Sequence, residues 1–505
     1  MMPGPSGHDV PGWLETADRS ARWDQLRVCV AGAGVSGTAA ADALLRFGAH
    51  VTVVDERSGD SVGGRATMLD LLGAELRLGP DNAKSLPDRT QLVVTSPGWR
   101  PSAPLLVAAA QAGVPVWGEV ELAWRLRATS DPAPWLVVTG TNGKTTTVRM
   151  LASMLRAGGH RSAAAGNIGS PLIEAVLADL STDGAGVPSV LAVELSSFQL
   201  HWASSPKPLA SAVLNIAPDH VDWHGSIDAY AQDKARAYTG TSVACVYNVQ
   251  DPRTEELLRD AEVQEGCRAI GFTLGTPASG MVGVVEDVLV DRAFVPEREH
   301  SAAELATFAD VAPFAPHNVA NALAASALAR AYGVPPRAVR DGLRAFRAEP
   351  HRIAFVAEID GVRYVDDSKA TNPHAAAASL AAYDRVVWIA GGLAKGADFD
   401  DLVSRTAPRL QGVVLLGRDR DRIAASLARH APHVPVVDVS STDTGVMDDV
   451  VRSARRLARR GKSDTVLLAP ACASMDLFDD YAARGDAFAT SVHRLASETG
   501  ESPPR

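Results

Sequence analysis

Twice in this chain an apolar strand pattern leads into a glycine-rich turn and then a helical pattern. The first strand pattern is Arg27–Ala31 and the second is Trp135–Thr139. This order of elements is typical of parallel sheets covered by helices, because a parallel strand needs a long crossover to reach its neighbour. Each of the two units therefore predicts the opening of a doubly wound α/β domain.

Further apolar strands extend this organisation along 505 residues, a length that suggests three domains, within a range of two to four. The predicted domains are residues 1–118, 119–348 and 349–505, with 1–24 expected to be a disordered extension. Further strand patterns lie at 51–54, 92–95, 189–193, 212–216, 363–365, 386–390, 412–416 and 466–468, and helical patterns at 120–127 and 319–332. The sequence thus predicts three successive α/β domains.

Charge and cysteine usage narrow the class of protein. The 49 basic and 59 acidic side chains give a net charge of −10, which disfavours general affinity for nucleic acid or anionic lipid. The four cysteines show no metal-ligand spacing, as expected in a reducing compartment. No apolar stretch approaches the roughly 18 residues of a membrane span, and no secretory signal pattern is present. We expect a cytoplasmic protein that binds small molecules, with no membrane or nucleic-acid partner.

The first glycine motif is a GxGxxG turn formed by Gly32, Gly34 and Gly37. Asp55 ends the next strand pattern, 18 residues beyond Gly37. Such a turn brings the backbone close to a diphosphate and points a helix N-terminus at it, while the acidic residue accepts from a ribose hydroxyl. Taken alone, this spacing favours a dinucleotide such as NAD. The alternative is that the glycines only allow close packing of strand and helix.

The second glycine motif, Gly140-Thr-Asn-Gly-Lys-Thr-Thr146, also lies between a strand and a helix. Its backbone N–H groups and Lys144 suit nucleotide phosphates, and the Thr145 hydroxyl suits Mg²⁺. The loop is shorter than the usual phosphate loop, and the alternative is an Asn-Gly turn with a surface lysine. Lysine is scarce, however, because 42 of the 49 basic residues are arginine. A nucleoside triphosphate site is therefore better supported than the dinucleotide site.

This loop resembles that of the Mur ligases, ATP-dependent enzymes that form amide bonds in peptidoglycan precursor synthesis. Four more motifs resemble the family members that add D-glutamate to UDP-N-acetylmuramoyl-L-alanine: ELSSFQL from Glu194, DSKATN from Asp367, GGLAKGADF from Gly391 and APACASMD from Ala469. The resemblance runs from residue 32 to 476. It implies a Rossmann-like N-terminal domain, a central P-loop ATPase-type α/β domain, and a Rossmann-like C-terminal domain that carries the amino-acid site and closes over ATP.

The resemblance replaces NAD with the UDP part of the substrate as the expected ligand of the first domain. The residues implied for the UDP-substrate pocket are Gly34, Val35, Ser36, Asp55, Glu56, Arg57 and Asn167.

The implied reaction has two steps. The alanyl carboxylate attacks the γ-phosphorus of ATP, and the amine of D-glutamate then opens the acyl phosphate through a tetrahedral intermediate. Both steps concentrate negative charge, so two Mg²⁺ ions are expected. The implied catalytic residues are Lys144, Glu194, His220 and Lys234, and the implied metal ligands are Thr145, Glu194, His220 and carbamylated Lys234.

Residue chemistry alone leaves simpler roles open for three of these side chains. In isolation, Glu194 is more often an ordinary strand-end carboxylate, and His220 a capping or hydrogen-bonding residue. The alternative for Lys234 is a solvated helix lysine. A carbamate nevertheless requires an amine that can lose a proton, which arginine cannot supply. A lysine at position 234 of this arginine-rich chain is a hint independent of the resemblance.

The resemblance also assigns ATP and D-glutamate sites. Asparagine at a helix start is usually an N-cap, but here the Asn318 and Asn321 amides are implied to hold adenine. The implied ATP-binding residues are Gly140, Thr141, Asn142, Gly143, Lys144, Thr145, Thr146, Asn318, Asn321, Arg352 and Asp367. Those implied for D-glutamate are Lys369, Thr371, Lys395, Ser474, Met475 and Tyr481. Four of the seven lysines, 144, 234, 369 and 395, fall within these motifs.

The alternatives are a folylpolyglutamate synthase-like enzyme or another Mur ligase within the same class. From other classes they are an NAD-dependent dehydrogenase and a non-catalytic nucleotide-binding subunit. The D-glutamate-adding ligase accounts for the most motifs, and we expect it to be a monomer.

Overall fold

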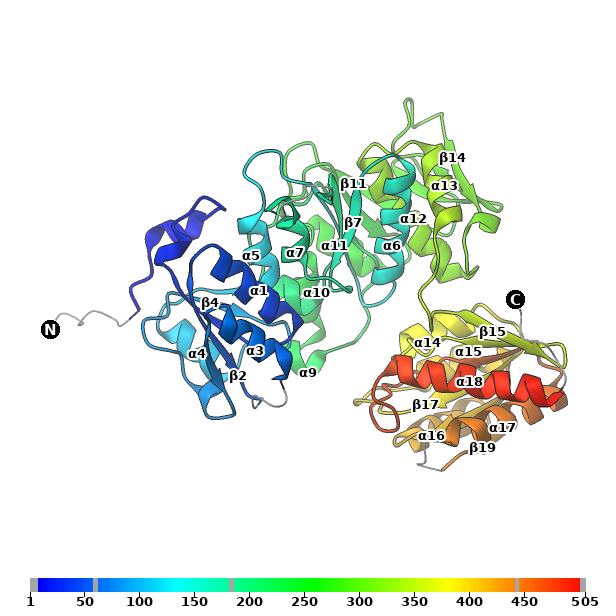
Figure 1. Ribbon diagram of the computed structural model, residues 1–505. Coiled ribbons are helices and arrows are strands. Elements are labelled where there is room, and N and C mark those ends of the chain that lie inside the picture. The colour runs from blue at the N-terminus through cyan, green and yellow to red at the C-terminus, as the bar shows by residue number, and fades with distance from the viewer. Residues whose placement is uncertain (1–7, 58–61, 181–185, 441–444, 500–505) are drawn as a thin grey trace. The chain divides into compact units, whose positions relative to one another are not determined.

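The computed structural model describes residues 8–57, 62–180, 186–440 and 445–499. The chain divides into two compact units. One comprises residues 1–307 with 321–345, and the other comprises residues 308–320 with 346–505. The first unit holds a five-stranded and a nine-stranded sheet, and the second holds a six-stranded sheet (Figure 1).

The first sheet has the order β3-β2-β1-β4-β5, and all of its pairs are parallel. Its strands are β1 (Arg27–Ala31), β2 (His50–Asp55), β3 (Glu75–Leu78), β4 (Leu92–Thr95) and β5 (Val116–Gly118). Its helices are α1 (Val35–Arg46), α3 (Gly64–Leu71), α4 (Pro104–Gln111) and α5 (Glu119–Leu126). Strand β1 is central and almost wholly buried, so the glycine turn after it lies in the middle of the sheet edge.

The segment before β1 is ordered where the structure describes it. Two short 3-10 helices, Gly12–Thr16 and Trp23–Gln25, bury Leu14 and Trp23, whose exposed fractions are 2% and 1%. The prediction of a disordered extension is therefore wrong for residues 8–24, and residues 1–7 lie outside the described ranges. Burial of a tryptophan and a leucine offsets the entropy lost in ordering such a short segment.

The second sheet has the order β14-β13-β12-β11-β10-β9-β6-β8-β7. Its strands are β6 (Trp135–Thr139), β7 (Ser162–Gly166), β8 (Val190–Glu194), β9 (Ala210–Val213), β10 (Ala244–Asn248), β11 (Arg268–Phe272), β12 (Met281–Val285), β13 (Val288–Asp291) and β14 (Ala303–Thr307). Its helices are α6 (Lys144–Ala157), α7 (Leu172–Val176), α8 (Ser197–His201), α9 (Val221–His224), α10 (Ile227–Ala235), α11 (Pro252–Arg259) and α13 (Pro336–Ala345). Helix α12 (Pro316–Ala331) runs from one unit into the other.

The strands β7 to β12 are parallel, and β12, β13 and β14 form an antiparallel extension. Every residue of β6 and β8 is buried, as expected for parallel strands covered on both faces.

The third sheet has the order β15-β16-β20-β17-β18-β19, and only the β15–β16 pair is antiparallel. Its strands are β15 (Ala354–Ile359), β16 (Val362–Asp366), β17 (Val386–Gly391), β18 (Leu410–Leu416), β19 (Val436–Asp438) and β20 (Thr465–Leu468). Its helices are α14 (Pro373–Leu380), α15 (Asp400–Thr406), α16 (Arg420–His430), α17 (Val446–Gly461) and α18 (Tyr481–Thr499). Helices α17 and α18 lie side by side (Figure 1).

The predicted fold class is confirmed, because all three sheets are predominantly parallel and carry helices. The strand predicted at 212–216 is displaced toward the N-terminus, since β9 spans Ala210–Val213. The antiparallel extension β12 to β14 was not predicted from sequence. Of the helices that the structure describes, none combines the length and apolar character needed to cross a membrane.

Candidate active site

The candidate residues of the central sheet lie at one edge. Strands β9, β6, β8 and β7 are neighbours and run parallel, so their carboxyl ends meet where ligands bind in such sheets. The groups that follow them are the His220 segment after β9, the phosphate loop after β6, Glu194 at the end of β8, and Asn167 after β7.

The phosphate loop has a backbone that requires glycine. Gly140 has φ +151° and Gly143, the N-cap of α6, has φ +85°, conformations that other residues adopt only with strain. A Cβ on Gly143 would lie 2.3 Å from Asn321 Oδ1. Asn321, one of the two residues predicted to hold adenine, therefore packs directly against the loop. Lys144 Nζ donates to the carbonyls of Gly140 and Thr141, each at 3.0 Å. The loop therefore combines a lysine with a helix N-terminus, which together favour a phosphate.

Two side chains that were not predicted from sequence hold this loop in place. The Asn142 N–H donates to Asn215 Oδ1 at 2.9 Å, and Asn215 Nδ2 donates to the Asn142 carbonyl at 3.1 Å. The Thr141 hydroxyl bonds to the Tyr230 hydroxyl at 2.9 Å. The available signals were weak: Asn215 is a polar residue just beyond an apolar strand, and Tyr230 lies one helical turn before Lys234 on α10.

Lys234 is buried beside the phosphate loop. Its side chain is 1% exposed, and its Nζ donates to the Gly140 carbonyl at 2.8 Å, the same oxygen that Lys144 contacts. Burial, reinforced by the positive charge of Lys144, lowers the pKa of Lys234 well below its usual value. The alternative of a solvated helix lysine is therefore wrong, and the amine is unusually easy to deprotonate.

Glu194 has a buried carboxylate oxygen that is suited to binding a cation. The residue is 2% exposed, and its Oε1 accepts from Asn167 Nδ2 at 3.0 Å. Its Oε2 is buried and has no hydrogen-bond partner among the described residues. Leaving a buried carboxylate oxygen without a donor is costly, and a hard cation such as Mg²⁺ would satisfy it.

His220 lies at the start of α9 in the left-handed conformation, with φ +51°. Its ring packs against Phe198 of the ELSSFQL motif, with ring centroids 4.7 Å apart, and its Nε2 lies 3.6 Å from Asp219 Oδ2. Within the described ranges no three His, Cys, Asp or Glu side chains gather as a metal site. The predicted ligand set contains only two residues of those types, Glu194 and His220, together with a threonine and a modified lysine.

A hydrogen-bonded chain that was not predicted from sequence joins the three short helices around this site. Asp233, next to Lys234, accepts from Nδ1 of His201 and Nδ1 of His224, each at 2.9 Å. His224 Nε2 bonds to the Ser197 hydroxyl at 3.0 Å. The chain therefore connects α8, α9 and α10, which adjoin Glu194, His220 and Lys234.

The first glycine turn packs tightly against itself. Gly32 has φ +103°, and a Cβ on Gly37 would lie 1.8 Å from the Gly32 carbonyl oxygen, whereas a Cβ on Gly34 would meet no atom within 4 Å. Val35 and Ser36 form the first turn of α1 beyond it. The space above Gly34 is therefore the open part of this turn.

The Asp55 carboxylate is saturated by donors from its own domain. It accepts from the Ala33 N–H at 2.7 Å and from the Arg57 N–H, Nε and Nη2 at 2.8, 3.0 and 2.8 Å. Burial acts to raise the pKa of Asp55, but these hydrogen bonds outweigh it and lower the pKa overall. Four donors fill the acceptor capacity of a carboxylate, so Asp55 is poorly placed to hold a ribose as NAD binding would require.

The residues predicted for the UDP pocket follow strands of two different sheets. Gly34, Val35, Ser36, Asp55, Glu56 and Arg57 adjoin the carboxyl ends of β1 and β2 in the first sheet, and Glu56 is exposed beside Asp55. Asn167 instead follows β7 of the second sheet and bonds to Glu194.

Five of the six predicted D-glutamate residues lie on three loops at the carboxyl ends of β16, β20 and β17, and Tyr481 is the first residue of α18. The Ala471 N–H donates to the Ala370 carbonyl at 2.9 Å, and Leu393 pairs with Ala473 at 2.8 and 3.0 Å. These contacts hold together the loops that carry Lys369 and Thr371, Lys395, and Ser474 and Met475.

The side chains of this set differ in their surroundings. The Lys369 ammonium lies 3.7 Å from the centre of the Tyr481 ring, and Ser474 is buried while Met475 is 60% exposed. Lysines beside hydroxyl and backbone donors suit a dicarboxylate.

The remaining predicted ATP residues lie in the second compact unit. Asp367 accepts from the Ser379 hydroxyl and the Ile353 N–H, and burial raises its pKa to about 6. Arg352 Nε pairs with Glu349 at 3.1 Å, and Asn318 Nδ2 donates to the Pro313 carbonyl at 2.9 Å. Asn318 and Asn321 both lie inside α12, which begins at Pro316, and are not its N-cap.

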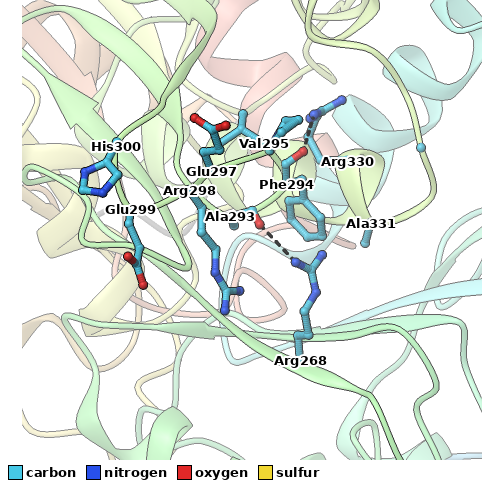
Figure 2. Close-up of a pocket in the computed structure, with 12 residues that line it drawn as sticks. Arg268, Ala293, Phe294, Val295, Glu297, Arg298, Glu299, His300, Arg330 and Ala331 are labelled. Atoms are coloured by element: carbon cyan, nitrogen blue, oxygen red, sulfur yellow. Dashed lines mark hydrogen bonds between the residues drawn. The ribbon is translucent and has the colours of Figure 1, made fainter.

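A separate cavity of about 920 Å³ contains none of the predicted residues. Figure 2 shows the arginines that line it. Arg268 donates to the Ala293 carbonyl and lies 4.6 Å from the Phe294 ring centre, and Arg330 pairs with Asp291 at 2.8 Å. Because two of the three arginines that line it, Arg268 and Arg330, are engaged by the protein, this cavity is a weaker candidate than the sheet edges.

Three family models match the chain in succession. They are described as Mur ligase MurD-like, N-terminal domain, over residues 26–118, Mur ligase middle domain over 138–329, and Mur ligase, glutamate ligase domain, over 351–472.

Named relatives match along almost the whole chain. The UDP-N-acetylmuramoylalanine--D-glutamate ligase of Streptomyces avermitilis is 62% identical over 94% of this chain and 99% of its own length. The enzyme of the same name from Thermobifida fusca is 60% identical over 93% and 98%. Among solved structures, the UDP-N-acetylmuramate-alanine ligase of Thermotoga maritima matches with a TM-score of 0.53 at 19% identity, covering 94% of this chain and 100% of that one. The structural match supports the fold alone.

Proposed function

This chain belongs to the Mur ligase family, and we propose that it joins D-glutamate to UDP-N-acetylmuramoyl-L-alanine with conversion of ATP to ADP and phosphate. Three relatives that carry this activity in their name are 60% to 62% identical to this chain over 98% or 99% of their own length. The main structural support for this chemistry is the phosphate loop. There the Nζ atoms of Lys144 and the buried Lys234 both donate to the Gly140 carbonyl, and Glu194 ends the neighbouring strand.

Binding of the triphosphate falls to the loop between β6 and α6. The N–H groups at the start of α6 and the Lys144 ammonium would neutralise the phosphates, and Asn215 would keep the loop rigid. Bound magnesium would supply further neutralisation of the charge that develops on the transferred phosphoryl group. Thr145, Glu194 and His220 are the residues that would hold it, and the orphaned Glu194 Oε2 supports that assignment.

We infer that Lys234 carries a carbamate. Its neutral amine would add to CO₂ with loss of one proton, which gives an anion able to bind magnesium. The burial that lowers its pKa supports this step, because only an unprotonated amine can add to CO₂. The Lys234→Arg variant keeps the charge but cannot form the adduct.

Carbamylation can be detected directly. Protein incubated with ¹³C-bicarbonate should show one carbamate carbon resonance that is absent from the Lys234→Arg variant, and the Lys234→Ala variant should recover activity with short carboxylates. A wild-type spectrum without this resonance, or full activity of Lys234→Ala in plain buffer, would contradict the assignment.

The amino-acid site is assigned to the three loops of the third sheet. Lys369 and Lys395 would neutralise the two carboxylates of glutamate, and Thr371 and Ser474 would donate hydrogen bonds to them. We also propose a monomer in the cytoplasm. All four cysteines lie in described residues and none forms a disulfide, as expected in a reducing compartment.

The decisive experiment measures phosphate release from ATP with UDP-N-acetylmuramoyl-L-alanine and either D-glutamate, L-glutamate or no amino acid. Release that requires both the nucleotide substrate and D-glutamate is the expected result, and Lys144→Ala should abolish it. Release with a folate substrate would favour the folylpolyglutamate synthase alternative, and no release under any condition would favour a non-catalytic nucleotide-binding protein.

A further inference from the structure

Arg484 is a fully buried cation in the third sheet's domain. It lies in the first turn of α18, and its side chain is 1% exposed. It forms no ion pair with a carboxylate in the described part of the chain, although burying an unpaired charge is costly. Its guanidinium is therefore stabilised mainly by hydrogen bonds, together with the longer-range attraction of Asp476 and Asp366.

Those hydrogen bonds go to three different loops. Arg484 Nε and Nη2 donate to the hydroxyl and the carbonyl of Ser368, at 3.0 and 2.9 Å. Its Nη1 donates to the Cys472 carbonyl at 3.1 Å and, at the longer distance of 3.5 Å, to the Gly391 carbonyl. Burial lowers the pKa of Arg484 to about 10, so the group remains charged at neutral pH.

Each contacted loop carries part of the predicted D-glutamate site. Ser368 immediately precedes Lys369, Cys472 precedes Ser474 by two residues, and the loop that begins at Gly391 carries Lys395. The Ser368 hydroxyl also donates to the Tyr481 carbonyl at 2.7 Å, which ties the first loop to the start of α18. One rigid planar group thus contacts every loop of the set.

We propose that Arg484 is a positioning residue that sets the spacing of these three loops and thereby the affinity for the dicarboxylate amino acid. The guanidinium presents its donors in a fixed fork, so its acceptors are held at fixed separations. A displacement of about 1 Å in a binding group can cost roughly 100-fold in rate. This inference rests on the proposed function of the three loops.

The matched variants are Arg484→Lys, Arg484→Ala and the control Arg494→Gln. Arg494 lies on the same helix but is exposed and pairs with Asp448. Arg484→Lys should raise the KM for D-glutamate by about 10- to 100-fold, with the KM values for ATP and the nucleotide substrate unchanged within about threefold. Arg494→Gln should change none of the three.

Chemical rescue distinguishes positioning from general stability. Millimolar methylguanidinium should lower the raised KM for D-glutamate of Arg484→Ala, whereas ethylammonium of similar size should not. Should Arg484→Ala fail to fold, Ser368→Ala removes one acceptor of Arg484 and should raise the same KM in the same direction.

The possible outcomes distinguish failure of the proposed function from failure of the positioning role of Arg484. Wild-type protein without D-glutamate-dependent phosphate release would overturn the proposed function itself. Active wild-type protein whose Arg484 variants keep the wild-type KM for D-glutamate, or shift all three KM values equally, would overturn the positioning role alone.

Discussion

The first glycine turn supports a prediction with an internal control, because two glycines three residues apart face opposite environments. Gly37→Ala would place a Cβ 1.8 Å from the Gly32 carbonyl oxygen and 2.9 Å from the Ser96 hydroxyl oxygen. Gly34→Ala would place one where no atom lies within 4 Å, at a backbone φ of −79° that alanine adopts freely. The two variants therefore test packing and ligand access separately.

The magnitude follows from the first of these distances. An ordinary non-bonded contact is about 3.5 Å, so the turn around Gly32 must move by roughly 1.7 Å to admit the new methyl group. Overpacking costs about 1 to 3 kcal/mol, and the upper end applies because the opposing atom belongs to the backbone. Gly34→Ala should change the free energy of unfolding by less than about 1 kcal/mol, since a weaker N-cap and a less flexible unfolded chain act in opposite directions.

The assay is urea unfolding followed by tryptophan fluorescence, together with calorimetric titration of UDP. Gly37→Ala should unfold at a clearly lower urea concentration and bind UDP weakly. Gly34→Ala should unfold like the wild type yet also bind UDP weakly, because its methyl group occupies the open space above the turn. Wild-type stability in Gly37→Ala would refute the tight turn, and wild-type UDP affinity in Gly34→Ala would refute the location of the ligand.

Three further predictions concern single side chains. Burial raises the pKa of Glu119 from 4.5 to about 7, so the folded chain retains a proton that the unfolded chain releases above pH 4.5. The free energy of unfolding should therefore fall by up to about 3 kcal/mol as the pH rises from 4.5 through 7. Urea unfolding at pH 5 and pH 8 measures this change. The Glu119→Gln variant should lose this pH dependence and should be more stable than the wild type at pH 8. Asn215→Ala loses both hydrogen bonds to Asn142, and phosphate-release kinetics should show the KM for ATP raised about tenfold. An unchanged KM for ATP would argue that Asn215 does not hold the phosphate loop in place. Tyr481→Phe keeps the ring beside Lys369 and should leave the KM for D-glutamate within about twofold of the wild-type value. Tyr481→Leu removes the ring and should raise this KM about 3- to 30-fold. Equal KM values for the two variants would exclude a role for the ring.

Sequence reasoning works best where the determinants are local. The strands β1 and β6 are predicted to the residue, because short apolar runs bounded by glycine turns leave few alternatives. It fails for the segment around Trp23, which shows no periodicity, and for the β12 to β14 extension. The N-terminal segment depends on distant residues such as Arg125, which donates to the Glu15 carbonyl. The β12–β13 hairpin is local in sequence and its strands are apolar, yet it was not predicted.

The sequence by itself determined the element types, the order of the motifs and the identity of the reactive side chains, because these depend on steric and chemical properties of neighbouring residues. Only the tertiary structure decided which of them meet. Lys234 reaches Gly140 across 94 residues, and Arg484 reaches Ser368 across 116. Such contacts follow from strand order and burial, and burial in turn makes Lys234 easy to deprotonate and makes Arg484 depend on backbone carbonyls. The sequence marks Lys234 only by the scarcity of lysine and by the family resemblance, and it does not distinguish Arg484 from a solvated arginine, so the surroundings of both cations emerge only once the sheets have formed.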